Sequence, residues 1–202
     1  LIVGLGGGTL PEAFFDLLDN VKIDTVEIDP AVIKVAKEYF LFDDNERKRV
    51  IAQDARVFIK RAILQSTEYD LVILDAFNGD YIPEHLMTKE FLLEVQKVLS
   101  RDGVLVANTF GTSKLYDYES NTYQVSMLFV SPISIGAVPI TRFHIVGLKP
   151  RVSRYIINSN IFQTLSQCIS YDTQRAICFF RFFCSRINVA FNSHRWKKIA
   201  CI

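Results

Sequence analysis

The residues Leu1-Ile-Val-Gly-Leu-Gly-Gly-Gly8 form an apolar segment that runs directly into glycines. The segment Val26-Glu-Ile-Asp-Pro30 follows, and it places Glu27 at the end of a second apolar stretch. A glycine-rich turn after one strand and an acidic residue after the next are typical of doubly wound α/β domains that bind a nucleoside. The turn lets the backbone approach the ligand, and the Glu27 carboxylate accepts hydrogen bonds from ribose hydroxyls.

The spacing of the glycines distinguishes between classes of nucleotide-binding turn. Gly4, Gly6 and Gly8 fit the pattern Gly-x-Gly-x-Gly, whereas the stricter nicotinamide fingerprint requires Gly or Ala where this chain has Thr9. No Gly-Lys-Ser/Thr sequence is present, which excludes a nucleoside triphosphatase loop. A tight turn without a ligand would not require so many glycines, so the pattern predicts a nucleoside-binding turn.

The first part of the chain alternates apolar strands and amphipathic helices. This alternation predicts an α/β fold with a Rossmann-like, doubly wound, mostly parallel sheet and right-handed crossovers. Asp29, Asp54 and Thr88 are candidate helix caps, and Asp102-Gly103 is expected to form a turn. We expect strands at residues 1–3, 23–28, 49–53, 69–74 and 104–109, helices at 10–18, 30–40, 55–64 and 88–99, and a loop at 77–87.

The charge distribution divides the chain into two regions. Residues 1–124 hold 21 of the 22 acidic residues, whereas residues 125–202 hold only Asp172 together with ten Lys and Arg residues. We therefore predict a nucleoside-binding core at 1–124 and an atypical basic C-terminal region at 125–202. That region would contain a last strand at 142–149, with candidate helices at 162–169 and 173–184. An aberrant reading frame and an unusual basic appendage both remain open as explanations.

Several classes of protein are excluded or disfavoured by composition. The four cysteines all lie in the second region without zinc-ligand spacing, so we expect no metal and no disulfide framework. Residues 125–141 carry no charge but contain two prolines and are shorter than a bilayer span, so we expect no membrane association. The basic patch at 195–198 is too short to indicate nucleic-acid binding. The chain begins inside a strand without Met, which we interpret as truncation at the N-terminus of a cytoplasmic protein.

Two further acidic residues end predicted strands. Asp54 ends the third strand and Asp75 ends the fourth, and the carboxyl ends of parallel strands converge on one crevice. Asp54 and Asp75 should therefore face the same ligand as Glu27. Asp54 could accept a hydrogen bond from an adenine amino group, cap the following helix, or do both.

The loop after Asp75 adds the acids Asp80 and Glu84 and also contains His85. A crevice with this many carboxylates favours a cationic ligand and repels phosphates. A sulfonium nucleoside and an amine substrate fit this charge, whereas a dinucleotide does not. His85 could contact the substrate, but we favour its interpretation as an ordinary solvated loop histidine.

Four motifs in residues 1–124 carry a resemblance. Residues 3–11, 26–30, 53–56 and 69–77 resemble the class I S-adenosylmethionine-dependent fold. More specifically, they are similar to the spermidine synthase (polyamine aminopropyltransferase) family and its bacterial spermidine-synthase-like relatives. Residues 75–91 are similar to that bacterial branch.

The resemblance implies a role for individual residues. Asp75 matches the aspartate that deprotonates or orients the attacking amine, and Asp80 replaces the family's second loop acid only approximately. Gly7 stands where authentic spermidine synthases have an Asp that helps to hold the amine of the cosubstrate. The implied nucleoside-binding residues are Glu27 at the ribose, Asp54 with Ala55 at the adenine, and Gly4, Gly6 and Gly8 beside the methionine-derived tail.

The resemblance also implies a reaction. We expect transfer of an aminopropyl group from decarboxylated S-adenosylmethionine to putrescine or a similar small amine, without a metal. Methyl transfer from S-adenosylmethionine is an alternative that Gly7 favours, and a catalytically inactive truncated relative is another. We expect no nucleic-acid or membrane partner, and a homodimer remains open.

Overall fold

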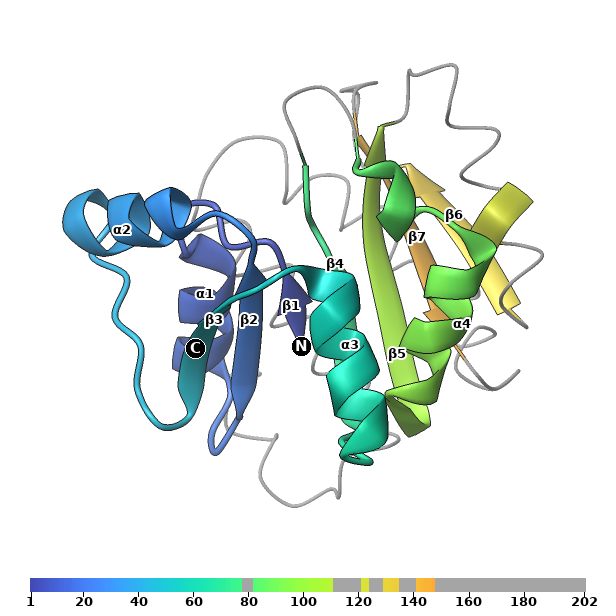
Figure 1. The fold of residues 1–202 in the computed structure, drawn as a ribbon, viewed down its shortest axis with the longest axis horizontal. Coiled ribbons are helices and arrows are strands. Elements are labelled where there is room, and N and C mark those ends of the chain that lie inside the picture. Colours follow the sequence, from blue (N-terminus) through green and yellow to red (C-terminus); the bar gives the residue numbers. More distant parts are fainter. Residues whose placement is uncertain (78–81, 111–120, 124–128, 135–140, 148–202) are drawn as a thin grey trace, which may run out of the picture.

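The protein, described here from a computed structural model, contains one seven-stranded sheet (Figure 1). The structure describes residues 1–77, 82–110, 121–123, 129–134 and 141–147. The strands lie in the order β3-β2-β1-β4-β5-β7-β6. Strands β1 to β5 pair in parallel, and β7 and β6 add antiparallel partners beyond β5. The strands span Ile2–Val3 (β1), Ile23–Glu27 (β2), Lys48–Ala52 (β3), Tyr69–Leu74 (β4), Leu99–Phe110 (β5), Phe129–Ser134 (β6) and Thr141–Gly147 (β7).

The helices begin at the caps that the sequence predicts. Asp29 accepts a hydrogen bond from the Ala31 amide at 2.8 Å, and Thr88 accepts one from the Phe91 amide at 3.2 Å. Such caps satisfy backbone donors that lack a partner within the helix. The helices are α1 (Thr9–Leu17), α2 (Pro30–Tyr39), α3 (Ala55–Leu64), the 3₁₀ turn η1 (Glu84–Leu86) and α4 (Lys89–Lys97).

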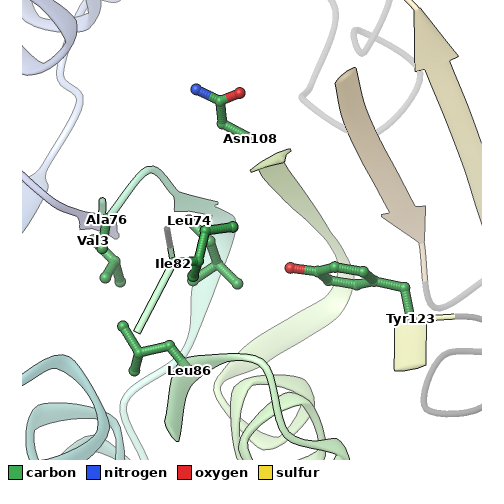
Figure 2. A pocket seen from close by; sticks show the side chains of 7 residues that line it. All are labelled: Val3, Leu74, Ala76, Ile82, Leu86, Asn108 and Tyr123. Carbon is green, nitrogen blue, oxygen red and sulfur yellow. The ribbon is translucent and has the colours of Figure 1, made fainter. Parts of the chain in front are cut away.

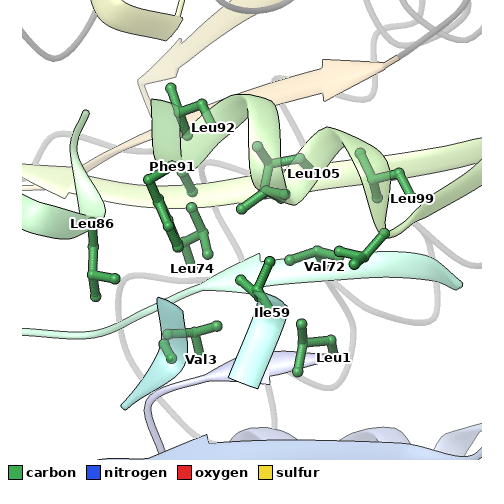
Figure 3. Packing of buried hydrophobic residues seen from close by; sticks show 14 of the residues in the cluster. Leu1, Val3, Ile59, Val72, Leu74, Leu86, Phe91, Leu92, Leu99 and Leu105 are labelled. Carbon is green, nitrogen blue, oxygen red and sulfur yellow. The ribbon is translucent and has the colours of Figure 1, made fainter. Parts of the chain in front are cut away.

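The core lies on both faces of the sheet, as expected of a doubly wound fold. Helices α3 and α4 cover one face, where Ile59 and Phe91 pack with Val72 and Leu105 of the two central strands (Figure 3). On the opposite face, Phe14 of α1 packs in a second cluster, together with Ile2, Ile23 and Ile73. The predicted mostly parallel, doubly wound architecture is therefore confirmed.

The expected turn at Asp102-Gly103 is wrong, because these residues lie inside β5. The register pairs Tyr69 with Leu99 and Leu71 with Val104, so residues 100–103 of β5 bulge opposite one residue of β4. A Cβ atom on Gly103 would lie 3.0 Å from the backbone of Ser100 and of Tyr69, so glycine suits this close approach. The strand continues because its pairing resumes beyond the bulge.

The remaining differences of more than one residue lie after residue 76, and the helix predicted at 88–99 ends at Lys97, because Leu99 already belongs to β5. The predicted loop at 77–87 contains η1, and β6 occupies part of the uncharged stretch, where we had not predicted a strand. Strand β7 corresponds to the predicted last strand. The predicted helices at 162–169 and 173–184 lie outside the described residues, and the division at residue 124 stays a prediction. None of the helices described is long and apolar enough to cross a bilayer.

Candidate active site

The glycine turn joins β1 to α1 and is held from both sides. The Gly4 amide donates to the carbonyl of Val26 at 2.8 Å, and the Asp75 amide donates to the carbonyl of Val3 at 2.8 Å. Gly4 has φ +97°, and a Cβ atom there would lie 2.3 Å from the Asp75 carbonyl oxygen. Only glycine allows the ends of β1 and β4 to approach so closely.

The other two glycines of the pattern differ in what surrounds them. Gly8 has φ +80°, and a Cβ atom there would lie 2.6 Å from the ring of Phe42. Gly6 has φ +54°, and a Cβ atom there would meet nothing within 4 Å. Gly4 and Gly8 are therefore required by packing, whereas Gly6 leaves open space over the turn that a ligand can enter.

Glu27 lies against this turn at the end of β2. Its Oε2 accepts a hydrogen bond from the Leu5 amide, and its Oε1 accepts one from the Asp29 amide, both at 3.0 Å. A carboxylate offers about four lone-pair sites, so each oxygen keeps one site free. The structure thus brings Glu27 to the turn as predicted, with capacity left for two hydroxyl donors.

Asp54 caps α3 and also binds His85, a residue outside the predicted site. Its Oδ1 accepts from the Val57 amide at 2.9 Å, and its Oδ2 lies 2.9 Å from Nε2 of His85 in η1. Interpreting His85 as an ordinary solvated histidine missed this pair, because 31 residues separate the two side chains in sequence. Burial acts to raise the pKa of Asp54, but the hydrogen bonds from Val57 and His85 outweigh it, so the net shift of the pKa is downward.

Asp75 lies at the end of β4, on the far side of the glycine turn from Glu27. Its Oδ1 accepts a hydrogen bond from Nδ2 of Asn108 on β5 at 2.9 Å. Burial raises the pKa of Asp75, and the hydrogen bond from Asn108 opposes this shift only in part. The buried Oδ1 of Asn108 accepts no hydrogen bond within the described residues. Within the described part of the chain, the pair therefore leaves Oδ1 of Asn108 available to a hydrogen-bond donor.

Asn108 is a further residue of the candidate site that was not predicted. The only signal was a polar residue following the apolar run of β5, which by itself does not indicate a partner. Asn108 lines a cavity of about 10 Å³, which also contacts Tyr123 (Figure 2). The Tyr123 phenol points toward Leu74 and Ile82 (Figure 2). The remaining lining residues are Val3, Leu74, Ala76, Ile82 and Leu86.

Other residues near the predicted site differ in what they can offer a ligand. Ile28 directly follows Glu27 and is 65% exposed, and the Gln53 amide donates to the carbonyl of Glu27 at 3.0 Å. An exposed apolar side chain therefore follows Glu27 directly, and this backbone hydrogen bond joins the carboxyl ends of β2 and β3. The Ala55 side chain is 6% exposed and belongs to the core, so only its backbone can contact a ligand. Asp80 lies outside the described residues.

A larger hollow of about 760 Å³ lies elsewhere, at the amino ends of the strands. It is lined by residues such as Asp24, Tyr69 and Val104, and by none of the predicted site residues. We assign the site to the carboxyl ends, where polar groups with spare acceptors converge. Among the residues that the structure describes, no group of three or more His, Cys, Asp or Glu could hold a metal ion.

Comparison with known sequences identifies relatives of this chain. The family described as spermine/spermidine synthase domain matches residues 1–143. A polyamine aminopropyltransferase of Vibrio vulnificus is 58% identical over 124 residues, which cover 61% of this chain and 42% of that protein. An N-terminal histidine N-methyltransferase of Emericella nidulans is 31% identical over 169 residues, which cover 83% of this chain and 28% of that protein. The chain thus spans less than half the length of these curated relatives.

Solved structures share the fold at low sequence identity. Human methyltransferase-like protein 13 in complex with SAH has a TM-score of 0.70 and 21% identity, over 93% of this chain and 80% of that one. A spermidine synthase in complex with the transition-state analogue AdoDATO has a TM-score of 0.66 and 16% identity, over 93% of this chain and 68% of that one. The family match covers well over half of the sequence, and on that ground the chain belongs to the spermine/spermidine synthase domain family.

Proposed function

We propose that this protein transfers an aminopropyl group from decarboxylated S-adenosylmethionine to putrescine or a similar small amine. The 58% identity to the Vibrio vulnificus aminopropyltransferase supports this proposal for the matched residues. Because the chain spans only 42% of that relative, the activity of the whole protein is inferred from the site rather than from the match alone.

The nucleoside would lie across the glycine turn. Glu27 would accept hydrogen bonds from both ribose hydroxyls through its two free lone-pair sites. Ile28 would pack against the adenine ring, and Asp54 would accept a hydrogen from its amino group. The open space above Gly6 would admit the sulfonium tail, which then points toward Asp75 because Gly4 contacts the Asp75 backbone.

The observation that carries the proposal is the pairing of Asp75 with Asn108. An amine that binds there would donate to Asp75 and to Oδ1 of Asn108, a buried acceptor that has no hydrogen-bond partner among the residues described. The apolar side chains of Leu74 and Ile82 beside Asn108 would contact the methylene chain of a diamine, but the cavity of about 10 Å³ that they line has room for only about one water, so the chain would have to lie outside it. A cationic donor and a cationic acceptor also explain why the site is built from carboxylates.

The reaction would be an in-line displacement. The amine nitrogen attacks the carbon next to the sulfonium, the new C–N bond forms as the C–S bond breaks, and methylthioadenosine leaves. A primary amine has a pKa near about 10 and is protonated at neutral pH, so a base must first take a proton. Asp75 is positioned for this role, and such a base contributes about 10²–10⁴-fold in rate. Positioning the two reactants next to each other would supply much of the remaining rate acceleration.

Methyl transfer from S-adenosylmethionine is the second candidate. Gly7 stands where an Asp would bind the free amine of the decarboxylated cosubstrate, and this absence favours a donor that keeps its carboxylate. Relatives named as methyltransferases, including the one from Emericella nidulans, support the same alternative. A relative that has lost activity is the third candidate.

A product assay separates these candidates. The chain is incubated with putrescine and, in parallel, with each of the two sulfonium donors, and products are identified by mass spectrometry. The proposal expects spermidine and methylthioadenosine from the decarboxylated donor only. A methylated amine from S-adenosylmethionine would establish the second candidate, and the absence of any product would leave the inactive relative.

We also propose that the protein is located in the cytoplasm and that it forms a homodimer. Fractionation of cells that express the protein tests the first. Light scattering during size-exclusion chromatography tests the second.

A further inference from the structure

We infer that His85 is a positioning residue that fixes the orientation of the Asp54 carboxylate and so determines selectivity for a 6-aminopurine. The inference rests on the proposed function, because it takes the nucleoside to lie along Glu27 and Asp54. It concerns a residue outside the predicted site, and it follows from three features of the structure.

The first feature is the way in which the Asp54 carboxylate is held. One oxygen accepts from the Val57 amide and the other lies 2.9 Å from Nε2 of His85. An ionised carboxylate can only accept, so Nε2 carries the hydrogen and donates it. Rotation of the carboxyl group would break both hydrogen bonds at once. Any remaining lone-pair site therefore points in a fixed direction.

The second feature is the anchoring of His85 itself. The His85 carbonyl accepts a hydrogen bond from Nη1 of Arg56 at 3.4 Å. Nε and Nη2 of Arg56 bind both carboxylate oxygens of Glu94 on α4, at 2.9 and 3.1 Å. Leu86, the next residue of η1, is buried in the core cluster between α3 and α4 (Figure 3). The backbone that carries the imidazole is thus attached to both neighbouring helices, although the ring remains 45% exposed.

The third feature is the match between this arrangement and adenine chemistry. The 6-amino group of adenine donates hydrogen bonds, whereas a 6-oxo group accepts them and a 6-hydrogen does neither. A fixed carboxylate acceptor can form a hydrogen bond with the 6-amino group but not with a 6-oxo group or a 6-hydrogen. A site that depends on this hydrogen bond binds analogues without the amino group more weakly. The lowered pKa of Asp54 keeps this acceptor ionised at neutral pH.

Removal of the imidazole would affect only one of the contacts that hold Asp54. Asp54 would keep its hydrogen bond to Val57, so α3 would remain capped, but Oδ2 would lose its partner. The carboxylate could then turn toward solvent. Selectivity for the amino group would fall, whereas contacts with the ribose at Glu27 would be unaffected.

The test compares two ligands across three proteins. The dissociation constants of 5′-methylthioadenosine and of its 6-deamino counterpart are measured by calorimetry for the wild type, His85→Leu and His85→Gln. We expect the wild type to prefer the amino compound by roughly tenfold or more, which is typical of a hydrogen bond to a charged group. His85→Leu should lose most of this preference while binding the deamino compound as well as before.

His85→Gln is the matched control. Its amide nitrogen can reach about the same place as Nε2 and donate to Asp54, so the preference should be largely retained. Thermal unfolding of all three proteins verifies that they are folded. If His85→Leu does not fold, the ligand preference of His85→Gln can still be compared with that of the wild type.

The inference fails if His85→Leu keeps the full preference, or if it weakens both ligands equally, since a merely structural role predicts equal loss. It also fails if the glutamine variant loses the preference as completely as the leucine variant. If the wild type binds neither ligand, the proposed function fails and the inference falls with it. If instead the wild type and His85→Leu both bind the amino compound with the same preference, the proposed function stands and only the inference about His85 fails.

Discussion

The carbonyl oxygen of Asp75 lies 2.3 Å from the position that a Cβ atom on Gly4 would occupy. The turn proposed to hold the nucleoside and the residue proposed to activate the amine are therefore in direct backbone contact. The hydrogen bond from the Asp75 amide to the Val3 carbonyl keeps this contact in place. The distance between the two halves of the site is thus determined by the sheet.

Replacement of Gly4 by alanine should destabilise the fold severely. The new methyl group would collide with backbone atoms, and φ +97° is strained for any residue with a side chain. We expect a loss on the order of 3 kcal/mol or more in the free energy of unfolding, measured with denaturant. Gly6→Ala is the control, because its Cβ would meet nothing within 4 Å and only the cost of positive φ, about 1–2 kcal/mol, applies. Equal losses in the two variants would contradict this account of the turn.

Asp75→Asn should abolish turnover and leave binding of methylthioadenosine nearly unchanged. The amide cannot take a proton from the amine, whereas Glu27 and Asp54 still bind the nucleoside. We expect a fall of at least about 10²-fold in kcat, measured by release of methylthioadenosine. Asp70→Asn is the control, since Asp70 lies near the amino end of the same strand, where it accepts a hydrogen bond from the Ser100 hydroxyl. Full activity of the Asp75 variant would refute its assignment as the base.

The pH dependence of stability should reveal the same carboxyl group. Burial raises the folded-state pKa of Asp75, so its contribution to stability is greatest below the unfolded pKa and is lost as pH rises through the folded value. At neutral pH the ionised group is a cost, which Asp75→Asn removes. We expect this variant to be more stable than the wild type at neutral pH, with the difference shrinking under acid conditions. Denaturant unfolding at several pH values measures this difference, and a variant less stable at neutral pH would contradict it.

Lys48 provides a prediction about stability away from the site. Its side chain is 1% exposed, and its Nζ lies 2.5 Å from a carboxylate oxygen of Glu12 and 2.9 Å from one of Asp43. The same Nζ lies over the rings of Phe15 and Phe42. Removing both acids would leave a buried ammonium without a counter-charge, at a cost of about 3–5 kcal/mol. Lys48→Met keeps the aliphatic stem and leaves carboxylates that water can reach, so it should cost less. Calorimetric unfolding of Lys48→Met and the Glu12→Gln, Asp43→Asn double variant tests this order, and the reverse order would contradict it.

Local patterns in the sequence were sufficient for most of the fold. The helix at 55–64 and the strand at 69–74 were predicted with the bounds that the structure has, because each has a clear apolar pattern and Asp54 provides a cap. The bulge before Val104 was mistaken for a turn because Asp-Gly is a turn signal, and only the pairing with β4 decides otherwise. Strand β6 was missed because it lacks charges and contains Pro132, which an edge strand tolerates.

The candidate site could be predicted only in part, because some of its contacts join residues that are far apart in the sequence. Glu27, Asp54 and Asp75 each follow an apolar strand, so the topology alone brings them to one edge of the sheet. Their partners His85 and Asn108 lie 31 and 33 residues away from the carboxylates that they bind. No short-range pattern encodes such pairs, and they become visible only when the helices and strands are assembled.

The central claim is that an adenosine moiety binds across the glycine turn and is held by Glu27. Calorimetric titration of 5′-methylthioadenosine into the wild type and into Glu27→Gln tests it most directly, with the helix-cap variant Asp29→Asn as control. We predict saturable binding to the wild type and to the control, and affinity lower by roughly tenfold or more in Glu27→Gln, because a neutral amide replaces a carboxylate that accepts charge-assisted hydrogen bonds. No binding to the wild type at millimolar ligand, or equal affinity in the wild type and Glu27→Gln, would contradict the account.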